Sequence, residues 1–383
     1  MTTQVIKVLT NETVNIQPVC TSLTGNITYS YSGDVGSWKP NIPVLFYTPP
    51  FTDGGTVRTL VFTATNGIDT RALTVELVIF RNWSNAVRYS TDPILPLGVS
   101  VHNMYGSDAA YIKDEMYWDG LWHTITQGKV GNLSIDWSNF VLWSSPNLLT
   151  WTIDPDPLML TVGASGAWDD KYIQHPSIIK VGDTWRMYYS AQSIANSKLG
   201  LATSTDFRTW TKYEGNPIYE GNPDGVGRVM IPSVIKIGNL YYLYYWNAGA
   251  DYENLMEYAT SEDGLTWTYG GVALPRTVGD WDYNYLNTGF DPYVIFNGYS
   301  YEMVYTSRNP DVSQRVGYAI SKDGITWHKH QGTILTGSGI EGSFDSLYPG
   351  DPAMFINNGI IYLYYAGDYA VGIAQGGVTI LTP

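Results

Sequence analysis

Three copies of one short motif, S-x-D-x-x-x-W, lie in the second half of the chain: STDFRTW at 204–210, SEDGLTW at 261–267 and SKDGITW at 321–327. A looser copy, SPNLLTW, lies at 145–151, with Asn147 at the aspartate position. The tryptophans recur about every 60 residues, and self-similarity at a fixed period is the signature of a repeat architecture. We expect each copy to be a hairpin turn whose tryptophan packs between neighbouring units.

A second repeated element consists of an apolar run, a glycine turn and an aromatic run. It is PSIIKVG leading to MYY at 176–189, PSVIKIG leading to LYY at 232–245, PYVIFNG leading to MVY at 292–305, and PAMFINNG leading to LYY at 352–365. A degenerate first copy, MYWDG leading to WHT, lies at 116–124. Short apolar and aromatic runs between turn residues predict strands. Five such copies predict a five-bladed β-propeller over residues 101–383.

The last copy ends at Pro383 without an S-x-D hairpin. Its outer strand would then come from the stretch 82–100. Pro93 and Pro96 in this stretch also indicate a linker between the two parts of the chain. That strand would close the ring.

Residues 1–81 show a different pattern. Apolar and polar residues alternate from Leu73 to Ile79, and earlier runs around Val14 and Tyr29 do the same, with the turn pair Asn66-Gly67 between runs. Period-two patterning with turns at this spacing predicts a β-sandwich. The stretches YTPP at 47–50 and FTATNG at 62–67 resemble bacterial immunoglobulin-like or cadherin-like repeat domains. The resemblance implies a spacer or an anchor.

Composition narrows the classes of function. The 31 tyrosines and 14 tryptophans favour β-structure and suit polyhydroxylated ligands, because each ring has an apolar face and a polar tip. The formal charge of −14 repels phosphate backbones, so we expect no nucleic-acid partner.

Other sequence signals set further expectations. A single cysteine, Cys20, rules out an internal disulfide framework. We expect no membrane span and no secretory signal. No spaced ligand cluster is visible, so the sequence nominates no metal-ligating residues and no cofactor, and it leaves open whether a metal occupies the central channel.

The residue just before each innermost propeller strand should point toward the mouth of the central funnel. That position holds His175, Ile231, Asp291 and Asp351 in the second to fifth copies. For the first copy, strict spacing places Lys113 there, whereas a short insertion would place Asp108 or Asp114 there.

With these motifs, residues 100–383 resemble the five-bladed propeller glycosidases, the arabinanase, xylosidase and fructosidase group. MYWDGLWH at 116–123 resembles their first-blade motif, and the Asp-Pro pairs at Asp291 and Asp351 resemble their strand starts. The resemblance implies two aspartates and a glutamate acid, because one carboxyl must protonate the leaving oxygen while another activates water or attacks.

The sequence departs from that pattern at several positions. Ile231 cannot ionise, and the fourth copy has Asp291 where the resemblance implies glutamate. Glu341, in the loop before the last copy, is the nearby glutamate that could serve as the acid. The candidate catalytic residues are therefore Asp108, Asp114, Asp291 and Glu341. The candidate substrate-binding residues are His175, Arg228, Trp281 and Asp351.

These observations lead to three hypotheses. The first is a carbohydrate-recognising, glycosidase-like structural protein of a virion, such as a bacteriophage fibre, tail or capsid decoration, with an eroded catalytic pattern. Its partners would be a polysaccharide or cell-surface glycan and, through the N-terminal domain, other virion proteins. The second is an active inverting glycoside hydrolase, and the third is a purely architectural module.

Overall fold

We describe a computed structural model of the chain. It covers residues 4–18, 28–33, 36–39, 44–90, 92–95, 100–101, 104–107, 112–130, 139–192, 197–223, 228–248, 254–275, 277–283, 290–308, 314–341, 343–367 and 375–383. Within these ranges no helix is long and apolar enough to cross a membrane.

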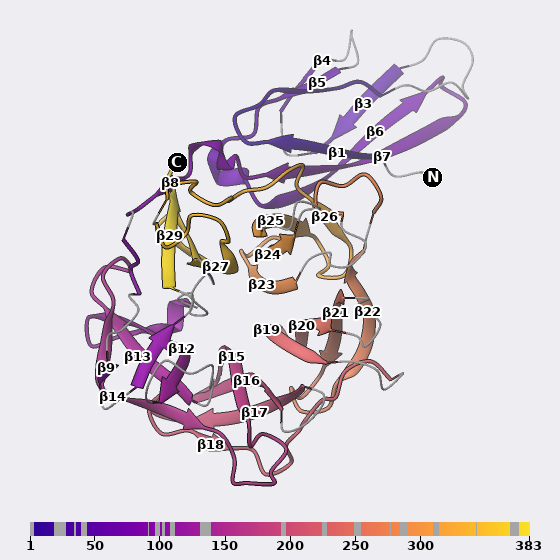
Figure 1. The fold of residues 1–383 in the computed structure, drawn as a ribbon. Helices are drawn as coiled ribbons and strands as arrows, with labels where there is room; N and C mark the ends of the chain where they lie inside the picture. Colours follow the sequence, from indigo (N-terminus) through magenta and orange to yellow (C-terminus); the bar gives the residue numbers. More distant parts are fainter. Residues whose placement is uncertain are drawn as a thin grey trace.

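The described residues from Val87 onward form five antiparallel sheets arranged around a central axis (Figure 1). This arrangement confirms the predicted β-propeller. The second to fifth sheets each run outward from an innermost strand: β15 (Tyr172–Val181), β16 (Thr184–Gln192), β17 (Lys198–Ser204) and β18 (Thr211–Lys212); β19 (Val229–Ile237), β20 (Leu240–Ala248), β21 (Asn254–Ser261) and β22 (Thr268–Leu274); β23 (Phe290–Phe296), β24 (Tyr301–Arg308), β25 (Gln314–Ser321) and β26 (Trp327–Lys329); β27 (Gly350–Asn357), β28 (Ile360–Gly367), β29 (Gln375–Leu381) and β8 (Val87–Arg88).

The first sheet has an interrupted inner edge. Both β10 (Met104–Ser107) and β11 (Tyr117–Trp118) pair with β12 (Leu121–Val130), and the 3-10 turn η3 (Asp114–Met116) precedes β11. The sheet is completed by β9 (Ser100–Val101), β13 (Asn139–Ser145) and β14 (Thr152–Thr161). The interruption explains why the first copy of the repeat is degenerate in sequence.

The S-x-D-x-x-x-W motif forms the turn after the third strand of a blade. In the second blade the Asp206 carboxylate accepts the N–H groups of Arg208 and Thr209 at 2.8 and 2.7 Å, which lowers the pKa of Asp206 to about 2. In later copies the tryptophan meets the preceding blade: Trp327 lies edge-on to Tyr244, with ring centroids 5.7 Å apart. The motif is therefore a structural turn.

The second strands of the second, third and fifth blades each carry a Tyr-Tyr pair, at 188–189, 244–245 and 364–365. The first tyrosine of a pair reaches the hairpin turn of the next blade. Tyr188 donates to the Gly264 carbonyl at 3.1 Å and Tyr244 donates to the Gly324 carbonyl at 2.8 Å. Tyr364 of the last blade donates to the Leu148 carbonyl of the first blade at 3.1 Å, so the same bond joins the two ends of the ring.

Tyr189, Tyr305 and Tyr365 each contact an aromatic–aspartate pair that precedes the inner strand of their own blade. In the fourth blade Tyr305 stacks on Trp281 and donates to Asp282 at 2.9 Å, and Asp282 also accepts from Lys329 of the outer strand at 2.9 Å. We call this arrangement the aromatic–aspartate clasp. Equivalent residues occur in the second blade (Trp168, Asp169, Tyr189, Lys212) and the fifth (Phe344, Asp345, Tyr365, Arg88).

The N-terminal region contains two sheets that share a core. One has the order β1 (Gln4–Leu9), β7 (Thr70–Phe80), β6 (Thr56–Thr65) and β3 (Thr28–Ser32); the other has β2 (Val14–Ile16), β5 (Val44–Tyr47) and β4 (Ser37–Lys39). Leu45, Leu60, Phe62 and Val75 are buried in the core between them. The region is a β-sandwich, and its immunoglobulin-like character stays a prediction.

The β-sandwich packs directly on the fourth and fifth blades (Figure 1). The 3-10 turn η1 (Phe51–Asp53) lies between β5 and β6, and the 3-10 turn η2 (Trp83–Asn85) lies between β7 and β8. Val57, Phe80 and Trp83 belong to one buried cluster with Tyr318 of β25. The Val57 N–H also donates to the Ser300 hydroxyl at 3.1 Å.

A buried ion pair crosses this junction. Arg81 donates to both carboxylate oxygens of Glu302 at 2.7 Å each, and Tyr318 and Asn297 donate to the same carboxylate. Burial alone would raise the pKa of Glu302, but Arg81 and these hydrogen bonds hold it below its usual value. Gly55 packs against the pair with φ of +82°, and a Cβ there would lie 2.4 Å from the Glu302 carboxyl carbon. The junction is thus built around a charge pair that requires both parts of the chain.

Replacing Arg81 with methionine should destabilise the protein by about 3–5 kcal/mol, because the buried Glu302 charge loses its partner. The free energy of unfolding from urea denaturation measures this effect. The control is Lys198→Met, which breaks the exposed Lys198–Glu220 pair and should cost at most about 1 kcal/mol. Equal, small losses in both variants would contradict the assigned role of the junction pair.

Candidate site in the channel of the propeller

Four inner strands begin with the same backbone irregularity. His175, Ile231, Asp291 and Asp351 have φ of 52°, 51°, 54° and 46°, and each precedes a proline. In each blade the pairing register between the first and second strands shifts at this point. A residue with left-handed backbone at such a bulge directs its side chain away from the regular pleat, here into the channel.

This conformation has an energetic cost for side chains with a Cβ. Aspartate and histidine adopt positive φ more readily than most residues, whereas a β-branched residue such as Ile231 is a genuine outlier. Such residues cost of order 1–3 kcal/mol each and cluster at functional sites. The repeated bulge therefore marks the channel as the candidate site.

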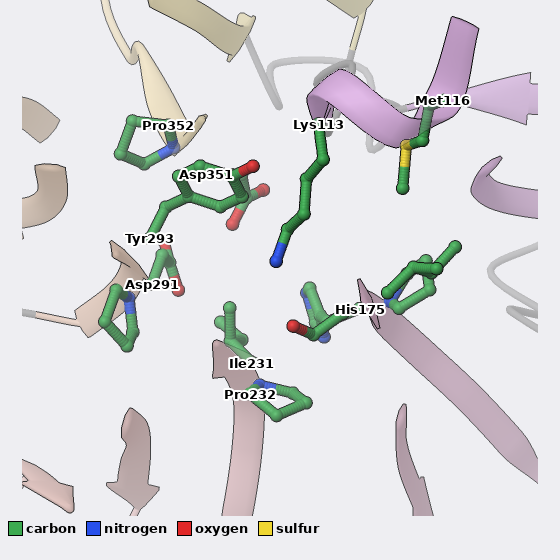
Figure 2. Close-up of a pocket in the computed structure, with 13 residues that line it drawn as sticks. Lys113, Met116, His175, Ile231, Pro232, Asp291, Tyr293, Asp351 and Pro352 are labelled. Atoms are coloured by element: carbon green, nitrogen blue, oxygen red, sulfur yellow. The ribbon is translucent and has the colours of Figure 1, made fainter. Parts of the chain in front are cut away.

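The four side chains line one cavity together with Lys113 and Met116 (Figure 2). We call it the carboxylate cavity, because Asp291 and Asp351 both face it and are each 4% exposed. Its volume is about 20 Å³, which is room for one water molecule. A sugar ring cannot enter the cavity and would have to bind across its mouth.

Lys113 occupies the middle of this ring of side chains (Figure 2). It comes from the interrupted edge of the first sheet, just before η3, and its amine donates to the Val234 carbonyl of β19 at 3.3 Å. Burial lowers the pKa of Lys113 to about 8, with Glu115 opposing the shift. Strict spacing of the repeat placed Lys113 at the first-blade position, and the structure has Lys113 there. The resemblance to the propeller glycosidases had implied an aspartate at that position.

A larger cavity of about 530 Å³ lies on the other side of Lys113. We call it the large cavity. Apolar side chains of the inner strands, such as Ile179, Ile235 and Phe355, line it together with charged residues that include Asp114, Glu115, Lys180 and Lys236. Lys113 lines both cavities. The inner-strand residues that line the large cavity follow those of the carboxylate cavity in sequence, so the two cavities lie one after the other along the channel.

The surroundings of the histidine in the carboxylate cavity favour its neutral form. Burial lowers the pKa of His175, and the nearby Asp351 carboxylate opposes that shift. The cavity therefore combines two carboxyl groups with one amine and one neutral imidazole. Across the described ranges, no three His, Cys, Asp or Glu side chains gather closely enough to hold a metal ion.

Several residues nominated from the sequence lie elsewhere. Asp114 lines the large cavity beside Glu115, and burial and that neighbouring carboxylate raise the pKa of Asp114. Glu341 and Arg228 are exposed and do not line the carboxylate cavity. Asp108 lies outside the described residues.

Trp281 also lies away from the channel, and its ring belongs to the aromatic–aspartate clasp of the fourth blade. It lines a pocket near the β-sandwich instead. The structure thus brings together His175, Asp291 and Asp351 from the sequence candidates and adds Lys113.

Comparisons with known proteins agree with this architecture. No family model matches the sequence. The chain can be aligned with the Mycobacterium tuberculosis protein Rv1502 over 231 residues at 28% identity. This alignment covers 56% of this chain and 73% of that protein. The chain is also 30% identical over 175 positions to a probable arabinan endo-1,5-α-L-arabinosidase A of Aspergillus flavus, covering 43% of this chain and 54% of that protein.

Solved structures of glycoside hydrolases superpose on most of this chain. A glycoside hydrolase superposes with a TM-score of 0.60 at 14% identity, covering 79% of this chain and 94% of the other. A thermostable family-43 glycoside hydrolase superposes with a TM-score of 0.54 at 19% identity, covering 74% and 90%. The chain therefore has a glycoside hydrolase-like propeller fold.

Replacing Lys113 with methionine should remove a pH dependence of stability. In the wild type the folded amine loses its proton near pH 8, whereas the unfolded amine keeps it to about pH 10.5. The unfolded state binds more protons between these values, so stability rises with pH there, by about 3 kcal/mol in total. Urea denaturation from pH 7 to pH 10.5 measures the difference between the two proteins.

Subtracting the free energy of unfolding of the variant from that of the wild type at each pH removes the effect of groups that titrate in both proteins, such as the tyrosines. Parallel stability profiles for the wild type and Lys113→Met would show that the amine is not buried in the channel.

Proposed function

We propose that the protein recognises carbohydrate at the mouth of its channel, above the carboxylate cavity. The observation that carries this proposal is the convergence of Asp291, Asp351 and His175 on one cavity, each from a bulge that holds its side chain toward the axis. Buried carboxylates are strong acceptors for sugar hydroxyls. The glycan-acting enzymes that share the fold support the same ligand class.

We further propose that the site binds without efficient hydrolysis. Glycoside hydrolysis requires one carboxyl group as acid and a second as base or nucleophile. Among the residues that the structure describes, the lining of the carboxylate cavity includes two aspartates, Asp291 and Asp351, but no glutamate. The third-blade position is Ile231, and Lys113 occupies the first-blade position. The exposed Glu341 is not among them. This set of groups supports recognition better than catalysis.

As the biological setting we propose a virion, in which the protein would be a fibre, tail or capsid decoration. A β-sandwich joined firmly to a glycan-facing propeller suits a particle that must attach to a cell surface. Mass spectrometry of purified particles tests this setting, and finding the protein solely in the soluble fraction of a cell without prophage would contradict it.

Asp291→Asn should weaken binding to the recognised polysaccharide by about 10- to 100-fold, because hydrogen bonds to a charged group contribute roughly 1.5–3 kcal/mol. Calorimetric titration against a panel of arabinan, xylan, levan and bacterial surface polysaccharides measures the affinity. The matched control is Asp183→Asn, an exposed aspartate in the turn after β15, which should bind as the wild type does.

The same mixtures should release no reducing ends. Release that disappears in Asp291→Asn would instead establish an active hydrolase. Absence of binding to every polymer would leave an architectural module.

A further inference from the structure

A second pocket lies at the junction between the β-sandwich and the fourth blade. Its volume is about 230 Å³. Three separate segments form it: β1 of the β-sandwich, the loop that follows β22, and the outer strand β26 with the residues after it. Its lining includes Lys7, Asp280, Trp281, Trp327, Lys329 and Gln331.

Two tryptophans give the pocket an aromatic surface. Trp281 and Trp327 are both partly exposed. The Trp281 ring stacks on Tyr305 with centroids 6.4 Å apart and an interplanar angle of 28°, and its Nε1–H donates to the His330 carbonyl at 3.3 Å. Because packing already fixes this ring, a ligand that stacks on it loses little side-chain freedom on binding.

Charged groups in the pocket are held in place and balanced. The Lys329 amine lies 2.6 Å from an Asp280 oxygen and 2.9 Å from Asp282. The Lys7 amine donates to the Lys329 backbone carbonyl at 3.0 Å, and burial lowers the pKa of Lys7. The pocket thus offers fixed donors and acceptors with little net charge, which favours an uncharged polar ligand.

We propose that this junction pocket binds one neutral sugar ring and is a second carbohydrate site, separate from the channel. A sugar ring has an apolar C–H face for an indole and hydroxyl groups for the paired ammonium and carboxylate groups. Pockets for drug-sized ligands have about 300–1,000 Å³, so a pocket of about 230 Å³ fits a single ring. The site goes beyond the proposed function and does not depend on it.

The fold contains a matched control for the aromatic surface. Trp168 stacks on Tyr189 in the second blade at 6.0 Å and 30°, much as Trp281 stacks on Tyr305. Within the described part of the chain, Trp168 lines neither channel cavity nor the junction pocket. Replacing either tryptophan with leucine removes an equivalent stack, so a difference in sugar binding between the two variants reports on the pocket.

Saturation-transfer difference NMR tests the proposal with three neutral probes: methyl α-L-arabinofuranoside, methyl β-D-xylopyranoside and methyl α-D-glucopyranoside. All proteins carry Asp291→Asn, which weakens the channel site, so failure of the channel proposal does not affect the result. At least one probe should give a signal that persists with Trp168→Leu and falls at least tenfold with Trp281→Leu. Gln331→Ala, at the exposed rim, should weaken it severalfold without disturbing the Trp281 stack.

Three results would overturn the proposal. These are no signal from any probe, an equal loss in Trp168→Leu and Trp281→Leu, or a signal that neither Trp281→Leu nor Gln331→Ala changes. Circular dichroism of each variant shows whether it is folded, and if Trp281→Leu does not fold, Gln331→Ala decides the outcome.

Discussion

A left-handed residue followed by proline, repeated at the start of four inner strands, is the constraint from which the candidate site follows. The bulge turns His175, Ile231, Asp291 and Asp351 out of the pleat and toward the axis. Since the proline supplies no N–H, the strand cannot pair regularly at that point, and regular pairing resumes after it. The channel therefore collects the same position from each blade, and the residue type at that position decides its chemistry.

Two repeated tyrosine interactions hold these strands in a ring. The first tyrosine of each pair bonds to the hairpin of the next blade around the ring. Tyr189, Tyr305 and Tyr365 belong to the aromatic–aspartate clasps of the second, fourth and fifth blades. In the third blade Tyr245 donates to Glu257 instead. The clasp of the fifth blade uses Arg88 of β8. Because β8 precedes the propeller repeats in sequence, the ring closes with a segment that adjoins the β-sandwich. Together with the Arg81–Glu302 pair, this arrangement ties the two parts of the chain into one unit.

The repeat made much of this fold predictable. The turn motif and the aromatic runs predicted the blades. The residues before the prolines, His175, Asp291 and Asp351, line the carboxylate cavity, and their roles in binding stay a prediction. The aromatic–aspartate pairs Trp168-Asp169 and Trp281-Asp282 were a further sequence signal for the clasp.

Other features depend on contacts between distant segments and left no local pattern. Asp114 is adjacent to Lys113 in sequence, yet η3 places it in the large cavity. Trp281 could not be assigned to the junction pocket without knowing where the β-sandwich packs. The proposed function requires intact carbohydrate to bind across the mouth of the carboxylate cavity. A crystal structure with an oligosaccharide of the best-binding polymer decides whether it does. We expect an uncleaved ligand within hydrogen-bonding distance of Asp291 and Asp351, whereas a cleaved product, or a channel mouth without sugar, would rule out this function.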